Sequence, residues 1–206
     1  MKQIDLAELL TLAAHEVRTP LGAMRGRIDV ALRRKRDVTQ HEAILHAIHE
    51  DLAVLSATVN ALLAVARPVP PGPPTLVRDL LVVSARRADA LLLAGGGRVT
   101  WTLEEDVVVS GHPAQLGMAI GLALVEVIRI GAGLPITVTV RSDKGWAVVG
   151  FSMGGTPTDR PSNLELIDLL ATTNGGRVVV PDAGEAEVLR LVLVDGTPRP
   201  DLTVVA

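Results

Sequence analysis

The chain has 206 residues, enough for one medium-sized domain or two small ones. Its 48% hydrophobic content includes one phenylalanine, two tryptophans and no tyrosine, so we expect an aliphatic core. A net charge of −3 gives no electrostatic basis for binding nucleic acid, and the lack of cysteine excludes disulfides and thiolate metal sites.

The sequence gives no sign of export or of a membrane span. Its N-terminus lacks the charged-then-apolar pattern of a signal peptide. The longest apolar run, from Leu116 to Val125, ends at Glu126 and is too short to cross a bilayer. We therefore predict a cytoplasmic protein that does not enter a membrane.

The first predicted element is a helix over residues 4–35. Its apolar side chains recur at spacings of three and four, which is typical of a heptad stripe. His15 and Glu16 fall off this stripe, so we expect the histidine to face solvent. The stripe consists of Leu10, Ala14, Val17, Leu21, Met24, Ile28 and Leu32.

A second helix is predicted over residues 40–66, with Thr39 as its N-cap and Glu42 completing a capping box. Two antiparallel helices with one apolar seam each cannot close a core alone. Pairing two such hairpins gives a four-helix bundle, so we expect a homodimer. The seam consists of Ile44, Ile48, Leu52, Leu55, Val59, Leu62 and Ala66.

Five prolines between residues 68 and 74 end this helix and favour an extended linker. The predicted domains are therefore a helical hairpin over 1–67, a linker over 68–74 and a second domain over 75–206.

In the second domain, helical segments alternate with short β-branched runs. Helices on one face of a mixed sheet form a two-layer α/β domain. The predicted fold class is α+β: an antiparallel helical hairpin forming a dimeric four-helix bundle, then a two-layer α/β sandwich. Helices are expected over 76–93, 113–130 and 164–173, and strands over 98–103, 107–110, 136–141, 146–152, 177–180 and 188–194.

His15 stands inside the first helix with Glu16, Thr19 and Pro20 close behind it. An exposed imidazole is partly neutral at cellular pH and can act as a nucleophile. A neighbouring carboxylate can accept a hydrogen bond from one ring nitrogen and leave the other free to attack phosphorus. The Thr19 hydroxyl, one turn on, can orient a water or a phosphoryl oxygen. Pro20 removes an amide and loosens the helix beside the histidine.

The heptapeptide HEVRTPL, residues 15–21, resembles the H-box of sensor histidine kinases. The order and length of the elements are similar to the dimerisation-and-phosphotransfer domain of these kinases followed by their ATPase-like catalytic domain. The resemblance implies that His15 is the phosphoacceptor and that Glu16 supports phosphotransfer. It also implies that Thr19 supports dephosphorylation of the partner. Arg18 and Pro20 are the predicted supporting residues.

The second domain departs from the kinase pattern where that family binds ATP. The helix over 113–130 is framed like the kinases' N-box helix, but its two asparagine positions hold Leu122 and Glu126. Ser152 stands where the acidic partner of adenine belongs. Residues 157–163 are too few for an ATP lid, and 163–167 contain no glycine that would admit phosphate to backbone amides. We therefore predict a degenerate domain and no cofactor bound by this chain.

A phosphoryl-accepting histidine without an ATP site is similar to the dimeric histidine phosphotransferases of bacterial phosphorelays. We predict that His15 moves a phosphoryl group between aspartates of response-regulator receiver domains. Mg²⁺ on the receiver would screen the transferring charge, and Arg18 and Arg25 would add positive charge beside it. Besides a second copy of this chain, the predicted partners are receiver domains, with an upstream hybrid kinase as a further candidate.

Two other functions stay open. The first is an ATP-dependent histidine kinase core with a diverged nucleotide site, although the lost motifs argue against autokinase activity. The second is a non-catalytic dimeric scaffold that binds response regulators. His41, His46 and His49 form a histidine cluster on the second helix, which we interpret as a solvated face rather than a metal site.

Overall fold

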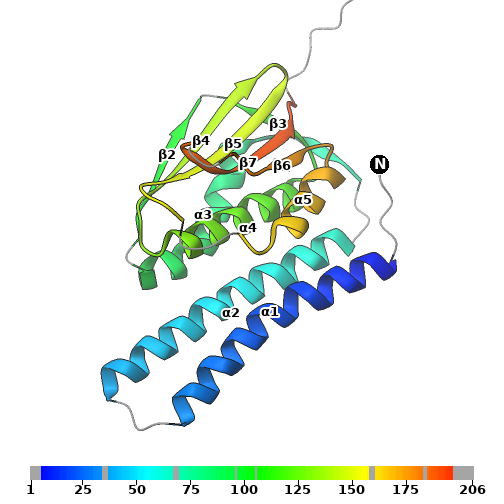
Figure 1. The fold of residues 1–206 in the computed structure, drawn as a ribbon. Coiled ribbons are helices and arrows are strands. Elements are labelled where there is room, and N and C mark those ends of the chain that lie inside the picture. The colour runs from blue at the N-terminus through cyan, green and yellow to red at the C-terminus, as the bar shows by residue number, and fades with distance from the viewer. Residues whose placement is uncertain are drawn as a thin grey trace, which may run out of the picture.

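The structure is a computed structural model. It describes residues 6–33, 37–66, 70–95, 97–104, 106–157, 161–182 and 185–196. A helical hairpin lies against one side of an α/β domain, as Figure 1 shows. This confirms the predicted α+β fold class.

The hairpin consists of α1 (Leu6–Leu32) and α2 (Val38–Ala66). The prediction that Thr39 caps α2 is wrong. The backbone amide of Gln40 donates to Asp37 Oδ1 at 2.8 Å, so Asp37 is the residue that caps the helix. Both residue types can cap a helix, and the cap is placed by the backbone, which becomes helical at Val38.

The α/β domain contains three helices and seven strands among the described residues. The helices are α3 (Val77–Gly95), α4 (Pro113–Gly131) and α5 (Leu164–Thr173). The strands are β1 (Gly72–Leu76), β2 (Val99–Leu103), β3 (Val108–Gly111), β4 (Ile136–Asp143), β5 (Trp146–Met153), β6 (Arg177–Val179) and β7 (Glu187–Val194). Residues 72–74 of the predicted linker thus begin a strand, which pairs with β3.

Five strands form the main sheet in the order β2-β4-β5-β7-β6. β2 runs parallel to β4, and the other pairs are antiparallel. Along β4 the side chains of Ile136, Val138 and Val140 are buried at alternate positions, the period expected of a strand with one face on the core. The helices α3, α4 and α5 cover that face (Figure 1).

α4 is the central helix, since nearly all of its side chains are buried. Its other side meets α2 through Val54, Thr58 and Ala61, which are buried at spacings of four and three. The sheet, the α3–α5 layer, α2 and α1 therefore follow one another through the molecule (Figure 1). The predicted seam residues Leu52 and Val59 lie on another face of α2 and stay 47% and 39% exposed.

Two described helices, α2 and α4, have the length and hydropathy of a membrane span. In α4, 83% of the apolar window is buried inside the protein, as expected for a core helix. Helices of this kind are weak evidence for a membrane protein.

Candidate functional site

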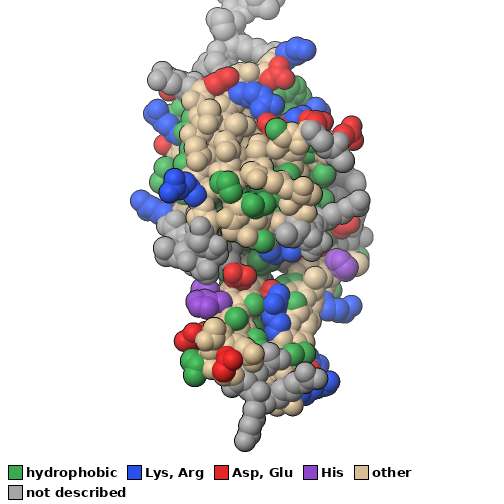
Figure 2. Space-filling model, turned by 60° about the vertical axis from the view of Figure 1, so that its left-hand side comes forward, with side chains coloured by type: hydrophobic (Ala, Val, Ile, Leu, Met, Phe, Trp, Pro, Cys, Tyr) green, Lys and Arg blue, Asp and Glu red, His purple; other side chains and the backbone are tan. Residues whose placement is uncertain are grey.

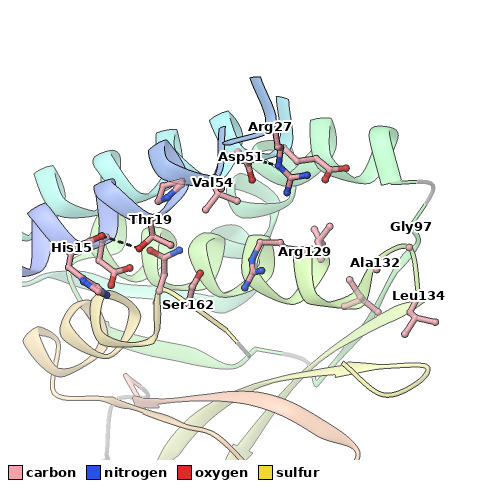
Figure 3. A pocket seen from close by; sticks show the side chains of 18 residues that line it. His15, Thr19, Arg27, Asp51, Val54, Gly97, Arg129, Ala132, Leu134 and Ser162 are labelled. Carbon is pink, nitrogen blue, oxygen red and sulfur yellow. Dashed lines mark hydrogen bonds and ion pairs between the residues drawn. The ribbon is translucent and has the colours of Figure 1, made fainter. Parts of the chain in front are cut away.

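A cleft of about 950 Å³ lies where α1 and α2 meet the α/β domain. Figure 2 shows the hollow between the two parts, with charged side chains and histidines along it. The predicted site residues His15, Glu16, Thr19 and Pro20 all line this cleft, and Figure 3 shows it from close by. The structure therefore brings four of the five predicted site residues to one place.

The His15 side chain is exposed at the edge of the cleft, as the sequence predicts. The Thr19 hydroxyl donates a hydrogen bond to the main-chain carbonyl of His15 at 3.3 Å (Figure 3). This hydroxyl lies on the same side of the helix as His15, but it is bonded to the backbone in this structure. It must rotate before it can donate a hydrogen bond to a water or to a phosphoryl oxygen.

Glu16 is only 6% exposed, although it falls off the apolar stripe of α1. Burial raises the pKa of the Glu16 carboxyl above its usual range, and the charge of His15 opposes this rise. The carboxylates of Glu165 and Glu126, both from the α/β domain, raise the pKa further. Two residues of the α/β domain therefore raise the pKa of Glu16, a residue of the hairpin.

Among the described residues, no hydrogen bond joins the Glu16 carboxylate to the His15 ring. Neighbouring residues on an α-helix point about 100° apart, because the helix has 3.6 residues per turn. The expected support of His15 by a directly bonded Glu16 is therefore not formed in this conformation, and a side-chain rotation or a bridging water would be needed.

The cations at the cleft are not the ones that the sequence suggests. Arg18 is exposed and does not line the cleft, and Arg25 lies 4.0 Å from Asp29 along the outside of α1. Arg27 and Arg129 line the cleft instead. Sequence reasoning missed Arg129 because its place beside α1 depends on how the two domains pack.

The N-box position of Glu126 is filled by a buried hydrogen-bond network. Glu126 is 0% exposed and accepts hydrogen bonds from the Ser162 amide at 3.0 Å and from the Asn163 side chain. Arg129 Nη2 donates to the same carboxylate at 3.0 Å. A buried carboxylate needs such donors. Two of these donors, Ser162 and Asn163, come from the segment before α5, so that segment packs against α4.

The other nucleotide-motif positions do not carry nucleotide-binding groups either. Leu122 is 1% exposed in the core, and Ser152 lies in β5 opposite Thr137. Gly154 turns the chain against Pro135, whose side chain would lie 2.7 Å from a Cβ at this position. Gly176 has a similar packing role, since a Cβ there would meet the Val192 carbonyl.

Within the described ranges, no three metal-ligating side chains are grouped so as to hold an ion. The His41 ring nitrogen Nδ1 lies 3.0 Å from the main-chain oxygen of Asp37, at the start of α2. This contact supports the interpretation of His41 as a helix-surface residue.

Residues 5–70 match the His Kinase A (phospho-acceptor) domain family. That match includes His15 and both helices of the hairpin. Over its helical hairpin the chain is histidine kinase-like. No curated protein matches the sequence, so the remaining comparisons rest on structure.

Solved histidine kinase structures share the fold of most of the chain. Histidine kinase AdeS of Acinetobacter baumannii has 12% identity and a TM-score of 0.58, covering 88% of this chain and 98% of that one. Histidine kinase ThkA, in complex with response regulator protein TrrA, has 15% identity and a TM-score of 0.59, covering 94% and 62%. Full-length ShkA in complex with AMPPNP has 16% identity and a TM-score of 0.54, covering 94% and 46%.

These likenesses show an H-box hairpin followed by an ATPase-like fold. The chain spans less than two thirds of the ThkA and ShkA chains that it matches. The matched structures are histidine kinases, and at 12–16% identity the likeness is one of fold. They do not test the role of any single side chain.

Proposed function

We propose that this histidine kinase-like protein acts in two-component signalling, with His15 as the residue that carries the phosphoryl group. The match to the phospho-acceptor domain supports this role. So does the exposure of His15 at a cleft shared by both domains. Glu16 and Thr19 are the proposed assisting residues.

We further propose that the phosphoryl group comes from the aspartyl phosphate of a receiver domain rather than from ATP. The observation that carries this choice is the Glu126 network. At the position where the kinase pattern has an asparagine, a buried carboxylate is bonded to Ser162, Asn163 and Arg129. A second negative charge brought to this place by a nucleotide phosphate would be repelled.

The second candidate is an ATP-dependent kinase core with a diverged nucleotide site. The fold comparisons favour it, since AdeS, ThkA and ShkA are histidine kinases. The cleft is also large enough for a small ligand, at about 950 Å³. The two candidates share the phosphorylated histidine and differ only in the donor.

In the transfer step, a ring nitrogen of His15 attacks phosphorus and forms a nitrogen–phosphorus bond. The bond from phosphorus to the aspartate oxygen breaks, and its electron pair stays on the departing carboxylate of the receiver. The proton on the other ring nitrogen then leaves to a base, for which Glu16 is the adjacent carboxylate. Mg²⁺ held by the receiver would screen the phosphoryl oxygens, so this chain supplies no metal.

Exposed apolar side chains on both helices support a homodimer. Leu10, Leu21 and Ile28 of the predicted α1 stripe are 60%, 48% and 44% exposed in the single chain, and Leu52 of α2 is 47% exposed. A second hairpin packed on these residues would bury them in a four-helix bundle. We propose that the dimer is cytoplasmic and binds receiver domains of bacterial response regulators.

The test offers the full-length chain two labelled donors in parallel: a phosphorylated receiver domain, and ATP with Mg²⁺. An acid-labile label from the receiver alone supports the phosphotransferase. A label from ATP overturns that choice in favour of the kinase. His15→Ala should abolish the label, whereas His49→Ala, an exposed histidine of α2, should keep it. No label from either donor would exclude a phosphoryl-carrying role.

A further inference from the structure

The side chain of Asn163 joins the hairpin to the α/β domain beside the His15 cleft. Asn163 is 2% exposed and precedes α5. Its Nδ2 donates to Glu126 Oε1 on α4, and its Oδ1 accepts a hydrogen bond from Thr58 Oγ1 on α2 at 3.2 Å. One amide group therefore connects the two domains inside the protein.

The orientation of this amide is set by its partners. An ionised Glu126 carboxylate only accepts hydrogen bonds, so the NH₂ group of Asn163 must face it. The amide oxygen is then left for the hydroxyl of Thr58. That hydroxyl shares its hydrogen with the Val54 carbonyl, 2.9 Å away on its own helix.

The members of the bridge are all buried deeply enough to depend on one another. Thr58 and Glu126 are both 0% exposed, and Ser162 adds its amide and its hydroxyl to Glu126. Inside a protein, removing one partner leaves the others unsatisfied, so such a network is held or lost as a unit. These hydrogen bonds thus hold the hairpin and the α/β domain together at Asn163.

Glu16 is buried at the same contact between the hairpin and the α/β domain. Glu16, Ser162 and Asn163 line one cleft, and Glu16 is nearly inaccessible to solvent. The carboxylates of Glu126 and Glu165, which belong to the α/β domain, act on its charge. The environment of Glu16 therefore depends on the α/β domain staying in place.

We propose that Asn163 is a positioning residue for His15 and Glu16: by tying Thr58 to Glu126, it holds the α/β domain against α1 and keeps the Glu16 carboxylate out of water. This rests on the proposed role of His15 as the phosphoryl carrier. The α/β domain then lines one side of the phosphotransfer site and does not move away from it. Loss of the bridge would expose Glu16 without removing any group that touches the phosphoryl group.

The charged groups around Glu16 come from every element at the seam. His15 neighbours it on α1, Glu126 is on α4, and Glu165 is on α5. The remaining charged residues of the cleft are Arg27, Glu50, Asp51 and Arg129. The pKa of Glu16 depends on all of these charges. A control variant must therefore leave the charged residues around Glu16 unchanged.

The first experiment follows the Glu16 carboxyl by NMR as pH is changed, in the full-length protein. In the wild type, Glu16 should titrate above the usual glutamate range. Asn163→Ala and Thr58→Val should return it toward that range. Ser84→Ala is the matched control, because the Ser84 hydroxyl is also buried and joins α3 to α4 away from the cleft. Its Glu16 titration should equal that of the wild type.

Glu165→Gln provides a variant whose folding is not at risk, because Glu165 is exposed on α5. Removing the charge of Glu165 should lower the pKa of Glu16 if the α/β domain lies against α1. Glu42→Gln, an exposed change at the far end of the hairpin, should not. An unchanged Glu16 titration in folded Asn163→Ala and Thr58→Val proteins would overturn the proposal, as would an equal change in Ser84→Ala.

The second readout is the pH dependence of phosphoryl transfer to His15. In Asn163→Ala, the midpoint of this pH profile should shift in the same direction as the pKa of Glu16. Transfer at neutral pH should slow by roughly tenfold, because His15 and Glu16 are no longer held in place. Ser84→Ala should keep the wild-type profile. If the wild type accepts no label, the proposed function fails, whereas the NMR titration still decides whether Asn163 holds the seam.

Discussion

The Thr19 hydroxyl donates to the main-chain carbonyl of His15 at 3.3 Å, on the last full turn before Pro20. Pro20 has no amide to donate to the Glu16 carbonyl, so this turn lacks one of the hydrogen bonds of a regular helix. The reactive stretch is thus held by a side-chain bond that can be released. A rotation about one Thr19 bond would free the hydroxyl for a water or a phosphoryl oxygen.

Thr19→Ala should leave the helix intact and change the fate of the phosphoryl group. The exposed hydroxyl contributes little to folding, so the free energy of unfolding should change by no more than about 0.5 kcal/mol. Dephosphorylation of the partner receiver should slow by roughly tenfold, because the water-orienting hydroxyl is gone.

Thr11→Ala is the control for this change. Thr11 Oγ1 makes the same kind of bond, to the Ala7 carbonyl at 2.8 Å, one turn before His15, and Thr11 does not line the cleft. Dephosphorylation assays with both variants should separate them. Equal rates in Thr19→Ala and wild type would contradict a role for this hydroxyl.

Pro20→Ala should stabilise the protein and impair transfer. Alanine restores the missing amide donor, and proline in a helix interior is about 3 kcal/mol less favourable than alanine. We expect the free energy of unfolding to rise by about 1–3 kcal/mol in urea titrations. Transfer to His15 should slow, because the helix beside the histidine becomes regular and stiffer.

Gly26→Ala tests whether added helix stability alone slows transfer. A Cβ at Gly26 meets no atom within 4 Å, so this change should stabilise α1 by about 1 kcal/mol without a clash. Its transfer rate should match the wild type. If both variants slow transfer equally, the effect belongs to helix stability and not to Pro20.

The sequence predicts the bounds of a helix where the residues that begin or end it stand next to it in the chain. Helix α5 has the predicted bounds because Asn174 and Gly175 end it: their amides donate to Ala171 and Thr172, and Gly175 has a φ of +76°. The cap of α2 was missed because Asp37 and Thr39 are both good caps. Only the backbone distinguishes them.

The sequence predicts residues that line the cleft, but not the surroundings that the fold gives them. His15, Glu16 and Thr19 stand in one motif, so sequence alone could single them out. The burial of Glu16 could not be predicted, because it depends on how the α/β domain packs, and the charges of that domain that act on Glu16 belong to Glu126 and Glu165, far along the chain. A signal for Asn163 did exist: a carboxylate within the apolar α4 must be matched by donors from elsewhere.

Acid should weaken the α/β domain through Glu187. Burial alone would raise the pKa of Glu187, but hydrogen bonds from Arg141 and Arg190 outweigh it and lower the pKa below the ordinary value. The ionised form is therefore favoured in the folded state. Its stabilisation is present above the unfolded pKa and is lost as pH falls through the folded one.

Glu187→Gln is the variant that tests this pH dependence. At pH 7 it should lower the free energy of unfolding by about 1 kcal/mol, the upper end for partly exposed ion pairs. The difference from wild type should shrink as the pH of the urea titrations falls below the glutamate range. A difference that stays constant with pH would show that charge is not the cause.

Glu126 offers the sharpest test of the second domain. Glu126→Leu leaves the buried amide of Asn163 without its acceptor, together with the less buried donors of Ser162 and Arg129. We expect a loss of about 3 kcal/mol in the free energy of unfolding, as for one partner removed from a buried pair. Glu165→Gln, an exposed change on the neighbouring helix, should cost little.

Glu126→Asn places the residue type of the kinase pattern back in α4. We expect no binding of ATP in calorimetry with Mg²⁺, because Leu122 stays buried in the core and Ser152 supplies no fixed acceptor for adenine. Binding in the micromolar range would mean that one carboxylate alone blocks a working nucleotide site. In that case the kinase alternative would gain over transfer from a receiver, since a single reversion would restore the ATP-binding step.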